Sequence, residues 1–194
     1  MAWWSGLFAL LTAITRVDLS RLETSNQTME MSDQLGLCDH TLPPTRLPTP
    51  YQGMNASSYY GWSWNADKAG DGSMDTMWMS VSKFEIVGQW IEVLLPAVYE
   101  IHSVTLSTSD YPCSRASIWR VELQLEDRVT LSTFDLEGDC DAGVGLTLAA
   151  AGEGEVLGTA RYVRATVLEA CPLCQATGNA AEVKEFDIYG RNCT

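Results

Sequence analysis

Basic residues are scarce in this chain. It has 12 lysines and arginines against 25 aspartates and glutamates, which gives a formal net charge of −13 and a pI near 4.4. Binding to phosphate groups needs a basic surface, so this composition argues against nucleic acid or an anionic membrane as a partner. The acidity suits either a calcium-rich extracellular setting or simply the solubility of the chain.

Histidines and other signatures of catalysis are also scarce. His40 lies in a proline-rich segment and His102 in a segment that alternates like a strand, and neither neighbours an obvious serine or cysteine nucleophile. The sequence has no glycine motif that would cradle a phosphate. We therefore expect a binding protein rather than an enzyme, with His102 a hydrogen-bonded strand residue.

We find no transmembrane span in the sequence. Residues 3–14 form an apolar run that is too short to cross a bilayer and resembles the apolar region of a secretory signal peptide, although the usual basic residue before it is missing. We predict a signal peptide over residues 1–17, a polar linker over 18–37 and secretion to the extracellular space. The alternatives are a mis-assigned start and a hydrophobic terminus packed on the domain. Three N-x-S/T sequons favour export: Asn26, Asn55 and Asn192.

The rest of the chain has the pattern of an all-β domain. Several segments are apolar runs, alternate apolar with polar residues, or are rich in β-branched and aromatic residues, and clusters of turn residues separate them. These segments are residues 89–95, which Pro96 closes, 98–106, 119–126, 161–168 and 183–189. No convincing amphipathic helix follows residue 40. We therefore predict a β-sandwich or barrel, with Trp78, Trp90 and Trp119 in its core.

The cysteines are even in number, as a disulfide framework requires. There are six of them, so 15 connectivities are open. The pair Cys171 and Cys174 forms a CxxC motif, which is typical of redox-active sites or of half a zinc site. The chain has no second CxxC and no thioredoxin-like βαβ pattern around this one. We favour a structural bridge, either within the motif or to Cys113 or Cys140.

Residues 68–78 form a short loop that is rich in oxygen atoms. Asp71, Ser73 and Thr76 offer side-chain oxygens at close spacing, and two glycines permit unusual backbone angles. Calcium takes six to eight oxygen ligands, so a second segment must complete the site, and Glu182 is suited to do so. The alternative is an ordinary Asp-Gly turn.

Four segments in the same order resemble the discoidin group, which includes coagulation-factor type C domains, fucose-binding lectins and family 32 carbohydrate-binding modules. The segments are residues 71–80, 89–125, 160–167 and 180–193. The resemblance implies a galactose-binding-domain-like jelly-roll β-sandwich over residues 38–194, with ligand loops at one end. It also implies a disulfide between Cys38 and Cys193, and a structural Ca2+ held by Lys68, Asp71, Ser73, Thr76, Ala181 and Glu182, with Lys68 and Ala181 acting through their carbonyls. Relatives usually have asparagine or aspartate in place of Ser73, so we expect weaker binding here.

The same resemblance suggests where a ligand would bind. Residues 59–65 are aromatic and fall where relatives have a ligand loop, so we predict a saccharide site made by Tyr60, Trp62, Trp64, Asn65, Asp110 and Arg115. The fucose site of the family uses one histidine and two arginines, and only Arg115 matches it. We therefore expect a different, neutral or weakly acidic glycan, bound weakly enough that several copies, as in a homo-oligomer, would act together. The alternative for Trp62 and Trp64 is core packing.

These features together predict a secreted, calcium-stabilised, lectin-like module whose partner is a cell-surface or matrix glycan. The rival hypothesis is an extracellular structural or assembly protein that uses the sandwich for contacts with another protein and has no sugar site.

Overall fold

The computed structural model describes residues 38, 42–81, 86–109, 116–138, 140, 146–149, 155–172 and 180–193. The predicted signal peptide and linker lie outside the described residues. The described strands pair in antiparallel fashion and form a two-layered sandwich, as the alternating sequence pattern predicts. No helix among the described residues is long and apolar enough to cross a membrane.

One long strand, β4 (Trp90–Thr108), joins the two layers. Its first part pairs with β2 and β8, and its second part pairs mainly with β9 and with β7. The prediction that Pro96 ends the first strand is wrong. Pro96 lies in the shift of register between Leu94 and Tyr99, where β4 passes from one layer to the other. Because that stretch forms no ladder with β8, the missing N–H of proline costs no strand pairing.

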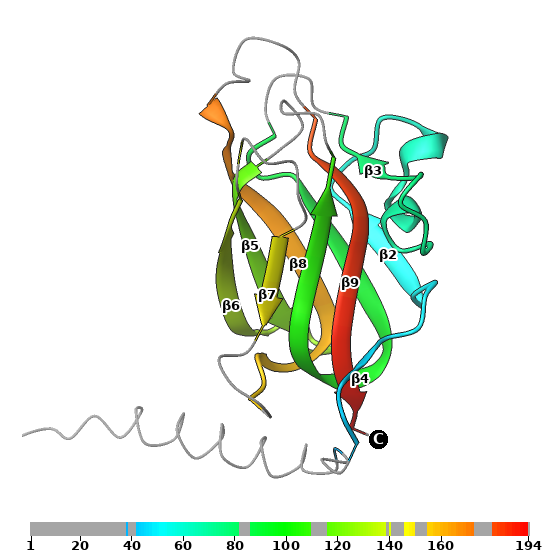
Figure 1. Cartoon of the computed structure of the whole chain (residues 1–194), viewed down its shortest axis with the longest axis vertical. Helices are drawn as coiled ribbons and strands as arrows, with labels where there is room; N and C mark the ends of the chain where they lie inside the picture. Colours follow the sequence, from blue (N-terminus) through cyan, green and yellow to red (C-terminus); the bar gives the residue numbers. More distant parts are fainter. Residues whose placement is uncertain are drawn as a thin grey trace, which may run out of the picture. The chain divides into compact units, whose positions relative to one another are not determined.

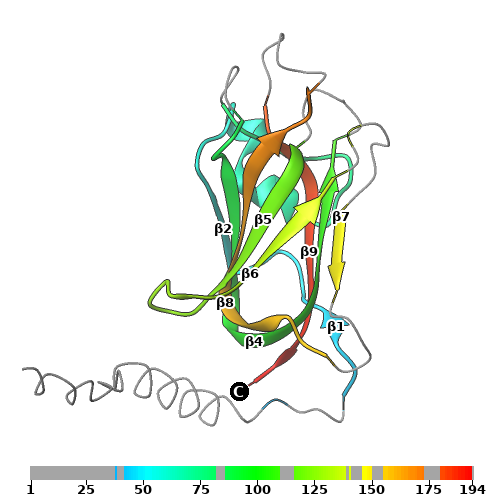
Figure 2. The ribbon, with the colours of Figure 1, turned by 90° about the vertical axis from the view of Figure 1, so that its left-hand side faces the viewer.

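The first layer holds the strands paired with the beginning of β4. Its order is β2 (Gly53–Ala56), β4, β8 (Gly158–Ala170), β5 (Ala116–Gln124) and β6 (Thr130–Glu137). Figure 2 brings β8, β5 and β6 to the front.

The second layer is built on the C-terminal strand. Strand β9 (Glu182–Asn192) pairs with β4 on one side, and β1 (Thr45–Arg46) and β3 (Trp78–Met79) pair with it as well. Strand β7 (Leu146–Ala149) pairs with β4. In Figure 1, β9 (red) runs beside β4 (green), so the end of the chain closes the fold against its middle.

The core lies between the layers and follows the alternation of the strands. The largest fully buried side chains include Trp78, Trp119 and Phe186. Trp78 and Trp119 are therefore core residues, as predicted. The prediction for Trp90 is wrong, because this residue is only half-buried and lies on the outward face of β4, where the Arg164 guanidinium stacks 4.3 Å from its ring centre.

Two disulfides join cysteines of the described residues. Cys38 is bonded to Cys193, which confirms the pairing implied by the resemblance. Cys171 is bonded to Cys140, which confirms that it takes part in a structural bridge rather than a zinc or redox site. Cys113 and Cys174 lie outside the described residues.

Candidate functional site

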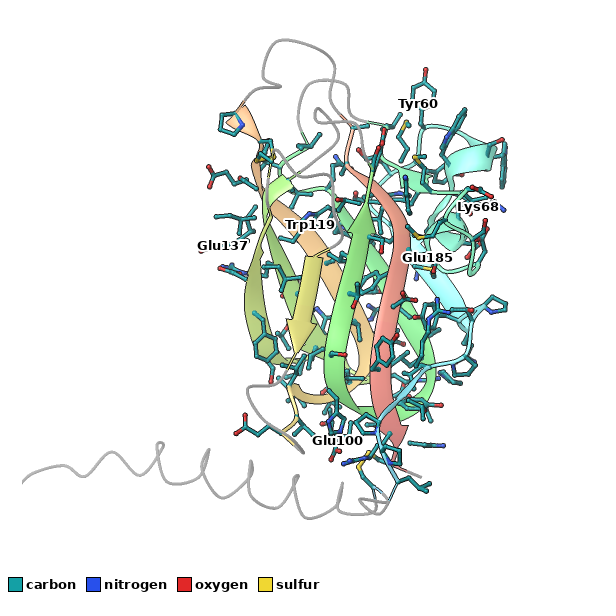
Figure 3. All side chains as sticks on the ribbon, viewed as in Figure 1. Tyr60, Lys68, Glu100, Trp119, Glu137 and Glu185 are labelled. Atoms are coloured by element: carbon teal, nitrogen blue, oxygen red, sulfur yellow. A yellow bond between two sulfur atoms is a disulfide. The ribbon has the colours of Figure 1, made fainter. Side chains whose placement is uncertain are left out.

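Four aromatic side chains gather on the segment between β2 and β3, and we call Tyr59, Tyr60, Trp62 and Trp64 the aromatic rim. The segment contains the short 3-10 helices η1 (Trp62–Trp64) and η2 (Ala66–Ala69). In Figure 1 these two turns lie on the outside of the sandwich beside β3. The figure with side chains shows Tyr60 pointing outward at this end of the molecule (Figure 3).

Hydrogen bonds to residues of β3 and to Val81 shortly after it attach the rim segment to the sandwich. The Tyr60 N–H donates to the Met79 carbonyl at 2.8 Å, and the Trp78 indole N–H donates to the Ser58 carbonyl at 2.8 Å. The Val81 N–H donates to the Ser58 hydroxyl at 3.0 Å. These three bonds join Ser58 and Tyr60 to residues of β3 or just after it, so the start of the rim segment is attached to the sandwich.

The rim side chains are exposed, so the two tryptophans are not core residues. Trp62 is 82% exposed and Trp64 37%, whereas Tyr59 and Tyr60 are 46% and 49% exposed. The rings form two pairs: Tyr59 with Trp62 at 6.1 Å between centroids, and Tyr60 edge-to-face with Trp64 at 5.6 Å. Such contacts limit the motion of large apolar side chains that water would otherwise disfavour. Aromatic surface held in this way can pack against the C–H face of a sugar ring.

Three other residues were predicted for the sugar site, and only Asn65 lies among the described residues. The Asn65 side-chain oxygen is buried and has no hydrogen-bond partner among the described residues. Asp110 and Arg115 lie outside the described residues. Tyr59 was not predicted, although its place directly before Tyr60 in the same aromatic segment would have suggested it.

The structure brings together the oxygen atoms of the loop that the sequence singled out. The Thr76 hydroxyl oxygen lies 3.2 Å from the Lys68 carbonyl, 2.8 Å from the Asp71 carboxylate and 3.0 Å from the Ser73 carbonyl. A hydroxyl has one proton, so Thr76 can donate to only one of these three acceptors at a time. Oxygen acceptors crowded in this way favour a cation between them.

Asp71 is ready to act as a charged ligand. Burial opposes its ionisation, but hydrogen bonds from the Thr76 hydroxyl, the Lys68 ammonium and the Ser73 N–H outweigh burial and lower the pKa of Asp71 below its ordinary value. The Ser73 N–H lies 3.0 Å and the Lys68 Nζ 3.3 Å from the carboxylate. The Lys68 ammonium thus offsets part of the negative charge of the Asp71 carboxylate, which is the charge that would attract a metal ion.

The second predicted segment lies on the strand next to this loop. Met79 pairs with Glu182 between β3 and β9, and the Ser80 N–H donates to the Ala181 carbonyl at 2.9 Å. Glu182 is only 6% exposed, and no hydrogen bond or ion pair of its carboxylate is found among the described residues. A buried carboxylate without a partner is costly, and a cation would remove that cost. The loop thus gathers oxygen atoms of Lys68, Asp71, Ser73 and Thr76, and the Glu182 carboxylate lies at the start of β9 with Ala181 directly before it.

Glu185 on β9, which the sequence did not single out, is also buried. Its carboxylate faces the Arg46 guanidinium at 3.4 Å. Burial, and then the neighbouring Asp187 carboxylate, raise the pKa of Glu185 above its ordinary value despite Arg46 and Gly72. Figure 3 shows Glu185 on β9 on the same side of the molecule as Lys68. Only its burial distinguishes it from surface glutamates.

His102 is a satisfied strand residue, as the sequence predicts. It is 7% exposed, and its Nε2 lies 2.7 Å from the Glu100 carboxylate. The Arg191 guanidinium lies 3.1 Å from the same carboxylate. The Glu100 carboxylate thus links His102 and Arg191 inside the fold, which agrees with a structural role for His102.

Comparisons with known proteins agree on the fold. No model of a protein family matches the chain, and no curated protein matches it. Among solved structures, the family 32 carbohydrate-binding module of C. perfringens NanJ, in complex with galactose, has a TM-score of 0.60 at 16% identity, over 75% of this chain and 98% of that one. A fucose-binding module of Streptococcus pneumoniae has a TM-score of 0.55 at 16% identity, over 74% and 95%.

A third similar structure is chitosan-binding module 1 of a chitosanase/glucanase from Paenibacillus sp. IK-5. It has a TM-score of 0.53 at 24% identity, over 71% of this chain and 94% of that one. At these identities the likeness concerns the fold, and it agrees with the discoidin-like resemblance of the sequence. The chain has the galactose-binding-like β-sandwich fold of family 32 carbohydrate-binding modules.

Proposed function

We propose that this chain is an extracellular carbohydrate-binding module, not an enzyme, and that its aromatic rim holds the sugar. The observation that carries the proposal is the exposure of Trp62, at 82%, on a segment that is hydrogen-bonded to strand β3. Large aromatic side chains are usually buried, and an exposed group of them marks a binding surface. Three modules of the same fold bind, according to their descriptions, galactose, fucose and chitosan.

We also propose that Ca2+ stabilises the module without contacting the sugar. Its ligands would be Lys68, Asp71, Ser73 and Thr76 of the loop, Glu182 at the start of β9 and Ala181 directly before it. The ion would supply positive charge to crowded oxygen atoms and pin two segments that are far apart in sequence. The rim ends at Trp64, four residues before Lys68, so an ordered loop also favours an ordered rim.

Two disulfides support the extracellular location. Bonds such as Cys38–Cys193 and Cys140–Cys171 persist in oxidising compartments and are rare in the cytosol. The predicted signal peptide and the sequon at Asn55, whose side chain is exposed on β2, point the same way.

A glycan array tests the proposal. The secreted chain with its disulfides intact should bind at least one class of glycan, and Trp62→Ala should lose that binding. Tyr189→Ala is the matched control, since Tyr189 is also an exposed aromatic residue, at 36%, but lies on β9 outside the rim. Binding that survives in Trp62→Ala, or that Tyr189→Ala weakens equally, would rule out the rim as the sugar site. A wild-type chain that captures another protein but no glycan would support the structural rival.

A further inference from the structure

One N-glycosylation sequon of the chain lies on a surface strand of the sandwich. Asn55, Ala56 and Ser57 form the sequence N-A-S, and the first two belong to β2. Met54 and Ala56 pack against the core, so Asn55 between them points to the outer face and is exposed. The side chain of Asn55 is therefore accessible from solvent.

The other two sequons have a different setting. Asn26 lies outside the described residues. The sequon at Asn192 has Cys193 as its middle residue, and this cysteine is bonded to Cys38. The sequon at Asn55 contains no cysteine, so no disulfide competes with its modification.

Strand β2 ends the first layer on one side. Among the described residues β2 pairs with β4 alone, with Asn55 opposite Glu92, and no described strand pairs with its other edge. In Figure 1, β2 (cyan) lies along one side of the sandwich. An edge strand with free backbone groups can pair with a strand of another chain, and natural proteins cover or block such edges. A large polar group on Asn55 would block this one.

The hydroxyl of Ser57 is used by the fold. It donates to the Gln89 side-chain oxygen at 2.6 Å and accepts from the Trp90 N–H at 3.0 Å. The Ser57 N–H also donates to the Trp90 carbonyl, at 2.9 Å. The sequon requires a hydroxyl at its third position, which implies that the transferring enzyme contacts it. That contact is available only before β2 pairs with β4, so a glycan on Asn55 has to be attached before the first layer closes.

We propose that Asn55 carries an N-linked glycan, which is attached before β2 docks on β4 and then shields the free edge of β2. The amide nitrogen Nδ2 of Asn55 bonds to the anomeric carbon of an oligosaccharide carried on a lipid pyrophosphate, and releases a proton to water. The bond from that carbon to the pyrophosphate oxygen breaks, and the lipid pyrophosphate leaves with its electron pair. The secretory compartment supplies this co-reactant, and the two disulfides support passage through an oxidising compartment. The inference goes beyond the proposed sugar-binding function and shares only its extracellular location.

Mass spectrometry of the chain secreted by eukaryotic cells tests the site. Enzymatic removal of N-glycans in heavy-oxygen water converts a glycosylated asparagine to labelled aspartate, and we expect this label at Asn55. Ser57→Ala should lose the glycan, whereas Ser57→Thr, which keeps the hydroxyl, should retain it. The peptide with Asn65 is the internal control, because Asn65 is also followed by alanine but has Asp67 at the third position. It should carry no label.

An unlabelled Asn55 in the secreted chain would overturn the inference. An equal label at Asn65, or a label at Asn55 that survives in Ser57→Ala, would show spontaneous deamidation and would overturn it as well. A chain that stays in the cytosol of these cells would overturn it together with the extracellular location. None of these results bears on sugar binding by the aromatic rim, which the glycan array tests separately.

Two further measurements test the order of events and the role of the glycan. The unglycosylated chain is offered to the transferring enzyme with its lipid-linked donor, either folded or reduced and alkylated, and only the unfolded form should be modified at Asn55. Equal modification of the folded chain would overturn the order. In sedimentation experiments, Asn55→Gln should self-associate more strongly than the glycosylated wild type. Equal association of the two would overturn the shielding of β2.

Discussion

The Thr76 hydroxyl lies 2.8 Å from the Asp71 carboxylate, five residues earlier in the same loop. The same hydroxyl lies within 3.2 Å of the Lys68 carbonyl, so three oxygen atoms from separate residues converge. Side chains and carbonyls that are spaced irregularly in sequence are thus brought to one point by the turn that Gly72 allows at a φ of 82°.

The calcium proposal predicts a melting temperature that depends on chelator. An ion at a hundredfold excess over its Kd stabilises the folded state by about 2.7 kcal/mol. For a domain of this size that corresponds to a fall of about 5–10 °C when the ion is removed. Asp71→Ala removes the charged ligand of the loop. It should therefore abolish the difference in melting temperature between calcium and chelator, measured by scanning calorimetry.

Asp75→Ala is the control for that experiment, since Asp75 is an exposed aspartate of the same loop whose side chain is not among the proposed ligands. It should keep the full calcium-dependent shift. An unchanged melting temperature of the wild type in chelator, or an equal shift in Asp71→Ala, would exclude a calcium site in this loop.

Replacing Trp119 and Trp62 by alanine should change the free energy of unfolding by very different amounts. Trp119 is 0% exposed, and Trp119→Ala should cost about 3–5 kcal/mol of the free energy of unfolding because it leaves a cavity in the core. Trp62 is 82% exposed, so Trp62→Ala should change that free energy by no more than about 0.5 kcal/mol. Urea denaturation measures both. Unfolding of Trp62→Ala would mean that the rim is a structural element.

The two disulfides should differ in what they contribute to stability. In the chain-entropy model, the bond between Cys38 and Cys193, 155 residues apart, contributes about 5 kcal/mol, and the bond between Cys140 and Cys171, 31 residues apart, about 4 kcal/mol. Replacing each pair by serines and comparing urea midpoints checks the order. If removing the Cys140–Cys171 bond lowered stability more than removing the Cys38–Cys193 bond, native contacts near Cys140, rather than loop entropy, would determine the contribution of the disulfide.

Tyr51 should make stability fall at high pH. Its hydroxyl donates to the Phe186 carbonyl at 2.7 Å and accepts from the Ile188 N–H at 3.2 Å. Burial, followed by the nearby Asp187 carboxylate, raises the pKa of Tyr51 well above its ordinary value. Above a pH of about 10 the unfolded chain loses this proton while the folded chain keeps it, so the contribution of Tyr51 to stability decreases as pH rises.

Tyr51→Phe tests this titration. At neutral pH the variant should be about 1–3 kcal/mol less stable, because two buried backbone groups on β9 lose their partner. The gap between wild type and variant should narrow as pH rises above about 10, measured by urea denaturation at several pH values. A gap that stays constant would mean that the hydroxyl titrates alike in the folded and unfolded chains.

Local pattern was enough to predict part of the fold. The alternation of residues 119–126 predicted β5, and the β-branched runs predicted β8 and β9, because alternate side chains of a strand face opposite sides. The extent of β4 was not predictable in this way. A proline ends a strand only where its position would have to donate a hydrogen bond to the neighbouring strand. Whether position 96 must donate such a bond depends on how the two layers join.

The chemistry of the candidate site was present in the sequence, whereas its exposure was not. Residue types and spacing alone determined that residues 59–65 are aromatic and that residues 68–76 carry closely spaced oxygen atoms. Only the tertiary structure decided that Trp62 faces water, that Trp90 lies on an outer face and that Glu185 is buried. The physical reason is that composition and spacing are properties of one segment, whereas exposure depends on what other segments pack against it, and here those segments are β3 and β9.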